Sequence, residues 1–156
     1  MRFGIHTLDE FDVAGKTVLC RLDLNRPVDR ATGTLKSTAR IEASVPTVRE
    51  LSDKGQSSFC SPISDIEYKI FYGTRPHADV LSRLLERPVQ WIDDVCGPAA
   101  REKISALQNG EILLLDNVRY VSEEQTLFEM KLRLTHEQQA KTLLVEKLAP
   151  LADYYV

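Results

Sequence analysis

The feature that most constrains this fold is an alternation of short apolar runs with longer segments of helical periodicity. The clearest runs are Lys16–Leu22, Val89–Ile92 and Glu111–Leu115. Such alternation is typical of an α/β domain, because parallel strands need helical crossovers between them. We therefore expect an α/β fold of the Rossmann-like type, a three-layer sandwich in which helices cover both faces of a mostly parallel sheet.

Helical periodicity predicts four helices: Ala39–Lys54, Pro76–Glu86, Pro98–Leu107 and Thr135–Leu148. Two of them begin with proline, which is favoured in a first turn, and Thr135 is a candidate N-cap. Pro46 lies inside the first helix and should kink or restart it, and Gly55 is placed to cap its C-terminus. Asp153–Val156 begins one more strand at the very end of the chain. We expect from this that the chain is truncated.

The segment Gln56–Ser64 does not fit the pattern. A second strand is due there, but the segment has little apolar content and carries Pro62 at its centre. Central parallel strands are rich in Val, Ile and Leu, and proline cannot donate to a ladder. We therefore predict that this strand is missing and that the chain is weakly stable. Losing a buried strand removes a large share of the roughly 5–15 kcal/mol that stabilises a domain.

Composition excludes several classes of protein. The chain has 156 residues with 20 basic and 23 acidic side chains, a balance unlike that of a general nucleic-acid binder. No apolar run approaches the roughly 18 residues of a membrane span. Cys20, Cys60 and Cys96 have no metal-ligand spacing, so no metal site is expected. An odd number of cysteines and a start without a secretory leader predict a cytoplasmic protein.

Candidate functional residues follow two predicted strands. Asp23 and Asn25 come directly after the first strand, and Arg119 follows Glu111–Leu115. Polar groups at the carboxyl ends of parallel strands point toward the place where ligands bind in open sheets. Arg40, at the start of a helix, adds a cation beside free N–H groups. Together these groups predict a pocket for a small phosphorylated or carboxylated metabolite.

Simpler interpretations stay open for single residues. Asp23 and Asn25 alone are more typical of an Asx turn leaving the sheet, and a lone arginine after a strand is usually a solvated side chain. His6, His77 and His136 have no nucleophile partner in a recognisable motif, and we expect all three at the surface. The chain contains neither a GxxxxGK[ST] loop nor a GxGxxG motif, so no nucleotide or other cofactor site is expected in it.

Four ordered motifs resemble those of the phosphoglycerate kinase family. VLCRLDLNRPV resembles its R-V-D-L-N-V-P-V signature, TARIEASVPT resembles T-R-I-x-A-x-L-P-T, and GEILLLDNVRY is similar to G-E-I-x-L-L-E-N-V-R-F. The last residues, KLAPLADYYV, resemble the family's segment before N-D-A-F. The sequences of VCGPAAR and of that last segment are most similar to those of archaeal members.

This resemblance implies a domain organisation and a reaction. The family transfers a phosphoryl group between 1,3-bisphosphoglycerate and ADP in glycolysis and gluconeogenesis. It uses Mg-ATP/ADP, bound by a C-terminal domain that this chain lacks. Residues 1–156 would be the N-terminal domain, truncated, which binds 3-phosphoglycerate. By resemblance, Asp23 and Asn25 contact the glycerate and Arg119 binds its 3-phosphate. Arg40 is the catalytic residue, which binds the carboxyl end and stabilises the transferring phosphoryl group.

The sequence departs from the family pattern at three places. Arg26 stands where the family usually has valine, and the chain ends before every nucleotide-binding residue of the family. Gln56–Ser64 replaces an apolar strand that ends in a His-rich phosphate-binding loop. If ordinary codons are chosen for this segment and the DNA is read in a frame shifted by two nucleotides, the translation can give such an apolar strand. Two compensating small insertions or deletions are therefore one hypothesis for its origin.

The sequence is therefore compatible with three hypotheses about what this protein is. The first is a phosphoglycerate kinase fragment that binds part of its substrate and is inactive alone. The second is a non-catalytic anion-binding α/β module or the product of a decayed gene. The third, an unrelated Rossmann-like protein, would require all four motifs to be coincidental.

Overall fold

The structure is a computed structural model of the chain. It describes residues 6–25, 34–55, 57–63, 73–124 and 132–156, together with the single residues 4, 29 and 32. Arg26, where the sequence departs from the family pattern, lies outside the described residues. So does the segment 64–72, which follows the second strand.

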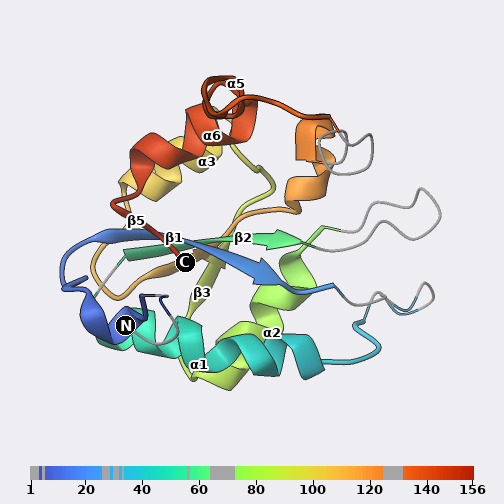
Figure 1. The fold of residues 1–156 in the computed structure, drawn as a ribbon. Coiled ribbons are helices and arrows are strands. Elements are labelled where there is room, and N and C mark those ends of the chain that lie inside the picture. The colour runs from blue at the N-terminus through green and yellow to red at the C-terminus, as the bar shows by residue number, and fades with distance from the viewer. Residues whose placement is uncertain are drawn as a thin grey trace.

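A five-stranded parallel sheet forms the centre of the molecule (Figure 1). Its strands are β1 (Thr17–Asp23), β2 (Ser57–Ile63), β3 (Val89–Trp91), β4 (Ile112–Leu114) and β5 (Tyr154–Tyr155). Their order is β3-β4-β2-β1-β5, and every pair is parallel. The predicted α/β class and parallel sheet are confirmed.

Two helices pack on one face of the sheet. They are α1 (Ala39–Asp53) and α2 (Arg75–Leu85), which lie below the sheet in Figure 1. Their buried side chains share one apolar cluster with every second residue of β1, among them Val18, Cys20 and Leu22. This alternation follows from the two-residue period of a strand, which sends neighbouring side chains to opposite faces.

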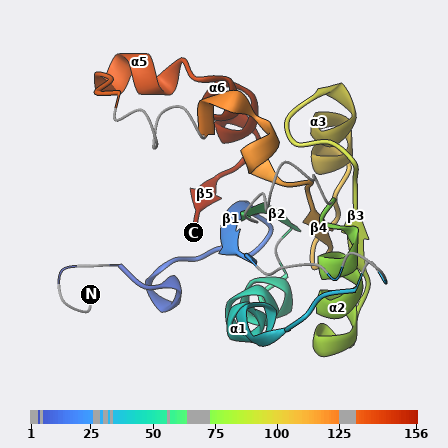
Figure 2. The ribbon, with the colours of Figure 1, turned by 90° about the vertical axis from the view of Figure 1, so that its right-hand side faces the viewer.

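The other face is covered by α3 (Pro98–Ser105) and α6 (Leu143–Leu148). Phe59, Leu113 and Leu115 meet these helices in a second apolar cluster. Figure 2 shows the resulting three layers, with the sheet between the two sets of helices. The first N–H groups of a helix have no partner within it, so those at the start of α3 need an acceptor. The Asp94 carboxylate accepts from the backbone N–H groups of residues 97 and 100, at 2.9 Å each.

The predicted helix Thr135–Leu148 is two helices in the structure. The first, α5, spans His136–Ala140, and α6 follows after a turn at Lys141 and Thr142. The predicted N-cap is confirmed, because the Thr135 hydroxyl accepts from the N–H of Gln138, whose side chain accepts from the N–H of Thr135. By contrast, α1 continues through Pro46 as one helix.

The prediction that the second strand is missing is wrong. Ser57–Ile63 forms β2, which lies at the centre of the sheet and pairs with β1 on one side and β4 on the other. Phe59 and Cys60 are fully buried in it. Strand preference depends strongly on context, and here two neighbouring strands supply backbone partners to a segment of low apolar content.

Pro62 is tolerated in β2 because of where its backbone points. The N–H of Ser58 donates to the Glu111 carbonyl and the Cys60 carbonyl accepts from Leu115, so alternate residues of β2 face β4. Pro62 faces the same side, but the last residue of β2 that pairs with β4 is Cys60. Its missing N–H therefore removes no ladder hydrogen bond.

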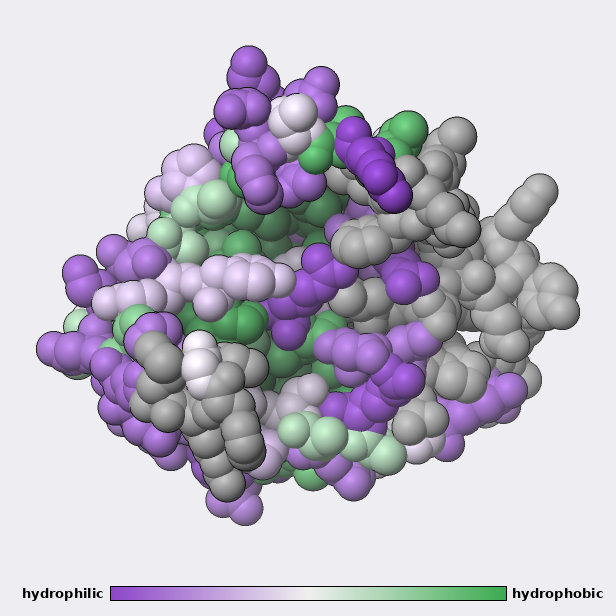
Figure 3. All heavy atoms as spheres, in the orientation of Figure 1, coloured by the Kyte–Doolittle hydropathy of each residue, from purple (hydrophilic) through white to green (hydrophobic). Residues whose placement is uncertain are grey.

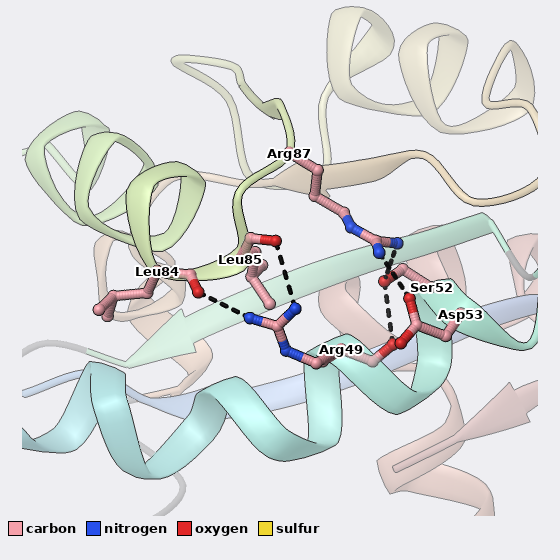
Figure 4. Close-up of polar contacts among 6 residues, drawn as sticks. All are labelled: Arg49, Ser52, Asp53, Leu84, Leu85 and Arg87. Carbon is pink, nitrogen blue, oxygen red and sulfur yellow. Dashed lines mark hydrogen bonds and ion pairs between the residues drawn. The ribbon is translucent and has the colours of Figure 1, made fainter.

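Reciprocal arginine contacts hold α1 against α2 (Figure 4). Arg49 of α1 donates to the carbonyl oxygens of Leu84 at 2.8 Å and Leu85 at 3.5 Å, at the C-terminus of α2. Arg87, just beyond α2, donates to the Ser52 hydroxyl and the Asp53 carboxylate at the C-terminus of α1. Cations at helix C-termini are favourable because the last carbonyls carry partial negative charge. These contacts fix the orientation of α1, and so of Arg40 at its other end.

Candidate functional site

The connections between strands change face between β2 and β4. β1 and β2 lead into α1 and α2 on one face, whereas β3 leads into α3 and β4 precedes α6 on the other. In the order β3-β4-β2-β1-β5, the change of face therefore falls between the neighbours β4 and β2. Ligands in open α/β sheets bind at the carboxyl ends of strands beside such a switch point. The candidate residues follow β1 and β4, which flank β2 on either side.

Asp23 ends β1 and makes two contacts. One carboxylate oxygen accepts from the backbone N–H of Asn25 at 3.1 Å, which is the Asx turn weighed from the sequence. The other oxygen accepts from the guanidinium of Arg40. Leu24, between Asp23 and Asn25, is fully buried and anchors the turn in the core. The structure therefore brings Asp23, Asn25 and Arg40 together at the end of β1.

Arg40 is the second residue of α1, and its side chain is 43% exposed. Its partner Asp23 has a side chain that is 57% exposed. An ion pair this exposed contributes at most about 1 kcal/mol, because water screens both charges. The guanidinium is thus aligned by Asp23 without being sequestered, and a ligand carboxylate or phosphate can reach it at low cost.

Arg119 lies at the end of β4, in a single 3-10 turn formed by Val118–Tyr120. The buried side chain of Asn117 caps this turn by accepting from the N–H of Arg119 at 3.1 Å. In the sheet, β2 lies between β1, which Asp23 ends, and β4, which Arg119 follows after a short connection. The structure places Arg119 at the same edge of the sheet as the Asp23–Arg40 pair, across β2.

A buried polar network supports the end of β4, and sequence reasoning missed it. The carboxylate of Asp116 accepts from the N–H of Thr74 at 2.9 Å and of Asn117 at 2.8 Å. The Thr74 hydroxyl donates to the Leu115 carbonyl, and Trp91 Nε1 donates to that hydroxyl at 3.1 Å. Strand β4 is thereby tied to β3 and to the start of α2. No sequence motif signals this network, because its members come from separate segments.

Burial and acidic neighbours shift the pKa values of two groups in the segment after β4. Burial raises the pKa of Asp116, and so does a hydrogen bond that its protonated form donates to the Asp93 carboxylate, against the opposing effect of its N–H donors. Burial and the nearby carboxylates of Asp116 and Asp93 raise the pKa of Tyr120 to about 12. Tyr120 is therefore a neutral hydrogen-bonding group at neutral pH and not a source of negative charge.

His77 is buried, so the prediction of a surface histidine is wrong at this position. Only 1% of its surface is exposed, in the first turns of α2. Among the described residues, neither ring nitrogen has a hydrogen-bond partner of normal geometry. Burial lowers the pKa of His77, and the backbone carbonyls of Leu24 and Thr74 oppose that shift from nearby. His6 and His136 are exposed, as predicted.

A groove of about 750 Å³ lies on the α6 face beside β5. Figure 3 shows hydrophobic atoms in the hollow between the α5–α6 segment and the edge of the sheet. Its charged members include Arg21, which pairs with Glu124. None of Asp23, Asn25, Arg40 and Arg119 lines it. Since its lining is mainly apolar and Arg21 is already paired, we place the candidate anion site at the strand ends instead.

The model of the phosphoglycerate kinase family matches residues 8–156 of this chain. The chain belongs to the phosphoglycerate kinase family. Among curated relatives, the phosphoglycerate kinases of Methanothermobacter thermautotrophicus and Sulfurisphaera tokodaii are each 44% identical to it, over 99% and 98% of the chain. The predicted archaeal type is thereby confirmed.

Solved structures of phosphoglycerate kinases share the fold. The enzyme of Pyrococcus horikoshii OT3 matches with a TM-score of 0.84 and 36% identity, over 97% of this chain and 36% of the other. That of Coxiella burnetii matches with a TM-score of 0.63 at 21% identity, over 95% of this chain and 33% of the other, and shows the fold alone. The chain spans about a third of the length of the phosphoglycerate kinases it matches, 36% for both curated relatives.

The described residues do not fit a resident metal ion. No three of their His, Cys, Asp or Glu side chains are grouped so as to hold one. Asp94, one of two adjacent aspartates after β3, has both carboxylate oxygens engaged at the start of α3. In the described part of the chain, no helix is long and apolar enough to cross a membrane.

Proposed function

We propose that this chain carries part of the 3-phosphoglycerate site of a phosphoglycerate kinase, a glycolytic enzyme that transfers a phosphoryl group between 1,3-bisphosphoglycerate and ADP. The observation that supports this most is the contact of Arg40 with Asp23 at the carboxyl end of β1. Family membership makes a phosphoglycerate the expected ligand for cations at this edge.

The geometry suits a small ligand with an anion at each end. Arg40 and the N-terminus of α1 lie at the β1 side, and Arg119 lies across β2. We assign the carboxyl end of the ligand, and the phosphoryl group in transfer, to Arg40. We assign the 3-phosphate to Arg119, whose planar fork can donate to two phosphate oxygens. Asp23 and Asn25 would bind the glycerate hydroxyl between them, through carboxylate and amide groups.

Catalysis by the isolated chain is not part of this proposal. The chain spans about a third of its relatives' length, and its sequence contains no phosphate-cradling glycine loop. We expect it to bind 3-phosphoglycerate and to transfer no phosphoryl group by itself. A coupled assay with Mg-ATP should give the rate of the enzyme-free blank, and turnover proportional to protein concentration would refute this expectation.

Calorimetric titration with 3-phosphoglycerate tests the binding site. Arg119→Ala and Arg40→Ala should each weaken binding about 10- to 100-fold, because hydrogen bonds to charged groups contribute roughly 1.5–3 kcal/mol. Arg83→Ala is the matched control. Arg83 is an exposed arginine in the last turn of α2, which leads back to the amino ends of the strands, away from the candidate site. Equal binding by Arg119→Ala and the parent chain would overturn the role of Arg119.

A non-catalytic anion-binding module remains the second candidate. The intact Asp23–Arg40 contact is compatible with it, because binding needs no nucleotide domain. The DNA that follows the codon for Val156 discriminates the two. A reading frame that continues into N-D-A-F and a glycine-rich nucleotide domain favours the kinase, whereas a stop codon favours the binding module or a decayed gene.

A further inference from the structure

Two cysteines face each other across the centre of the sheet. Cys20 of β1 is the register partner of Cys60 in β2, although they are far apart in sequence. Both belong to the apolar cluster under α1 and α2, and 1% and 0% of their surfaces are exposed. The two thiols are neighbours, and each shifts the pKa of the other. The third cysteine, Cys96, lies in the cluster on the opposite face.

We propose that Cys20 and Cys60 are a site of reversible oxidation, at which a disulfide bond closes between the two central strands. With oxidised glutathione as the oxidant, one thiolate attacks the glutathione disulfide and releases one glutathione. The second cysteine then attacks the resulting mixed disulfide and releases another. In sum, two cysteine thiols lose two protons and two electrons, and one oxidised glutathione becomes two reduced glutathione molecules.

The spacing of the strands permits this bond. Neighbouring strands lie about 4.8 Å apart, which places the Cα atoms of register partners within the disulfide range of about 4.4–6.8 Å. Side chains of register partners run side by side, so their Cβ atoms are nearly as far apart, somewhat beyond the mean of about 3.8 Å. Closure must draw the strands together. A strained disulfide is more easily reduced, so this one is reversible and not a permanent crosslink.

The environment also sets how fast the pair reacts. Interaction with Cys20, together with burial, raises the pKa of Cys60, so that thiol stays protonated in the closed sheet, and only a thiolate is a nucleophile in exchange. Because both sulfurs are buried, an oxidant reaches them only when the sheet opens locally. The rate should then become independent of oxidant concentration once opening is limiting.

Thiol counting on the native chain tests the site. After incubation with oxidised glutathione and quenching in acid, the three thiols of the chain should fall to one, and dithiothreitol should restore them. Trypsin should release residues 17–21 linked to residues 55–69. Cys96→Ser is the matched control and should keep the crosslink, whereas Cys20→Ser and Cys60→Ser should lose it.

Several results would overturn the proposal. One is the persistence of all three thiols in the native chain under conditions that oxidise the urea-unfolded chain. Others are a crosslink that involves Cys96, a crosslink between two chains, or a glutathione adduct that never resolves. The Cys96→Ser chain decides the matter even where the other two variants fail to fold, because it leaves the Cys20–Cys60 pair intact. Binding of 3-phosphoglycerate plays no part in this readout. The test of the Cys20–Cys60 pair is therefore independent of the proposed function.

Discussion

Replacing Ser58 with alanine should stabilise this chain. Ser58 is fully buried in β2, between its register partners Val18 and Ile112. Its hydroxyl has no hydrogen-bond partner within the described part of the chain. A buried polar group without a partner costs about 1–3 kcal/mol, because it loses water without compensation.

The magnitude follows from what alanine removes. The substitution deletes a single oxygen and keeps the Cβ atom, so the void it leaves is small and offsets part of the gain. We expect a net increase of about 1–2 kcal/mol in the free energy of unfolding. For a domain of this size, 1 kcal/mol shifts the thermal midpoint by about 2–4 °C, so the midpoint should rise by about 2–8 °C.

The neighbouring serine provides the matched control. The Ser57 hydroxyl lies 3.0 Å from the Thr17 hydroxyl and 3.5 Å from the Lys16 carbonyl, so Ser57→Ala removes a satisfied group. That variant should lose about 0.5–1.5 kcal/mol. Thermal unfolding followed by circular dichroism measures both. A lower midpoint for Ser58→Ala, or shifts of equal sign for the two variants, would refute the reasoning.

Three further predictions concern stability. The chain should melt below about 60 °C, because β2 buries polar serines where parallel strands normally bury Val, Ile and Leu; a sharp cooperative transition above that temperature in a calorimeter would contradict this. Arg49→Met should lower the free energy of unfolding, measured in urea, by about 1–2 kcal/mol, because it removes the hydrogen bonds from Arg49 to α2. The control Arg83→Met should change it by less than about 0.5 kcal/mol. Equal losses in the two variants would be inconsistent with the α1–α2 contacts described. His77 should make the fold acid-sensitive, because its pKa is lowered in the folded chain. As the pH falls below about 6.5, only the unfolded chain gains the proton. The free energy of unfolding should therefore decline by up to about 1.4 kcal/mol per pH unit, until the pH passes the folded pKa. Urea unfolding at pH 7.5 and 5.5 checks this, and an unchanged decline in His77→Leu would exclude His77 as its source.

Sequence patterns predicted the strands with apolar side chains and failed for β2. β1 and β4 stood out because their residues are mostly apolar: every second residue of β1 is buried, and all three residues of β4 are. β2 is equally central, but its burial is imposed by the strands on either side and not by its own composition. Only the register shows that Pro62 lies beyond the last pairing with β4. The hypothesis of shifted reading frames for this segment stays a hypothesis, and the underlying DNA tests it.

The buried histidine and the buried cysteine pair differ in how visible they are from the sequence. His77, Leu81 and Leu85 are spaced by four residues, which places the histidine on the buried face of α2, so this signal was present and was outweighed by the polarity of histidine. The Cys20–Cys60 contact has no local signal. It depends on the register of two strands, and a shift of one residue would send the two thiols to opposite faces.

The members of the candidate site stay a prediction, and their support was not visible from the sequence. Asp23, Asn25 and Arg119 were proposed because polar residues follow apolar strands, and Arg40 because it begins a helix. The contact between Asp23 and Arg40 joins one of those strand ends to that helix start. The Asp116–Thr74–Trp91 network was not predictable, because it joins three segments through tertiary hydrogen bonds.

We propose that 3-phosphoglycerate binds at the carboxyl ends of the strands. A titration of the isotope-labelled chain followed by nuclear magnetic resonance tests it directly. We predict concentration-dependent shifts of the backbone amides of Asn25, Arg40 and Arg119, and unchanged amides at Arg83 and along the groove beside β5. Shifts confined to that groove, or no shift at the strand ends at millimolar ligand, would contradict binding at the strand ends.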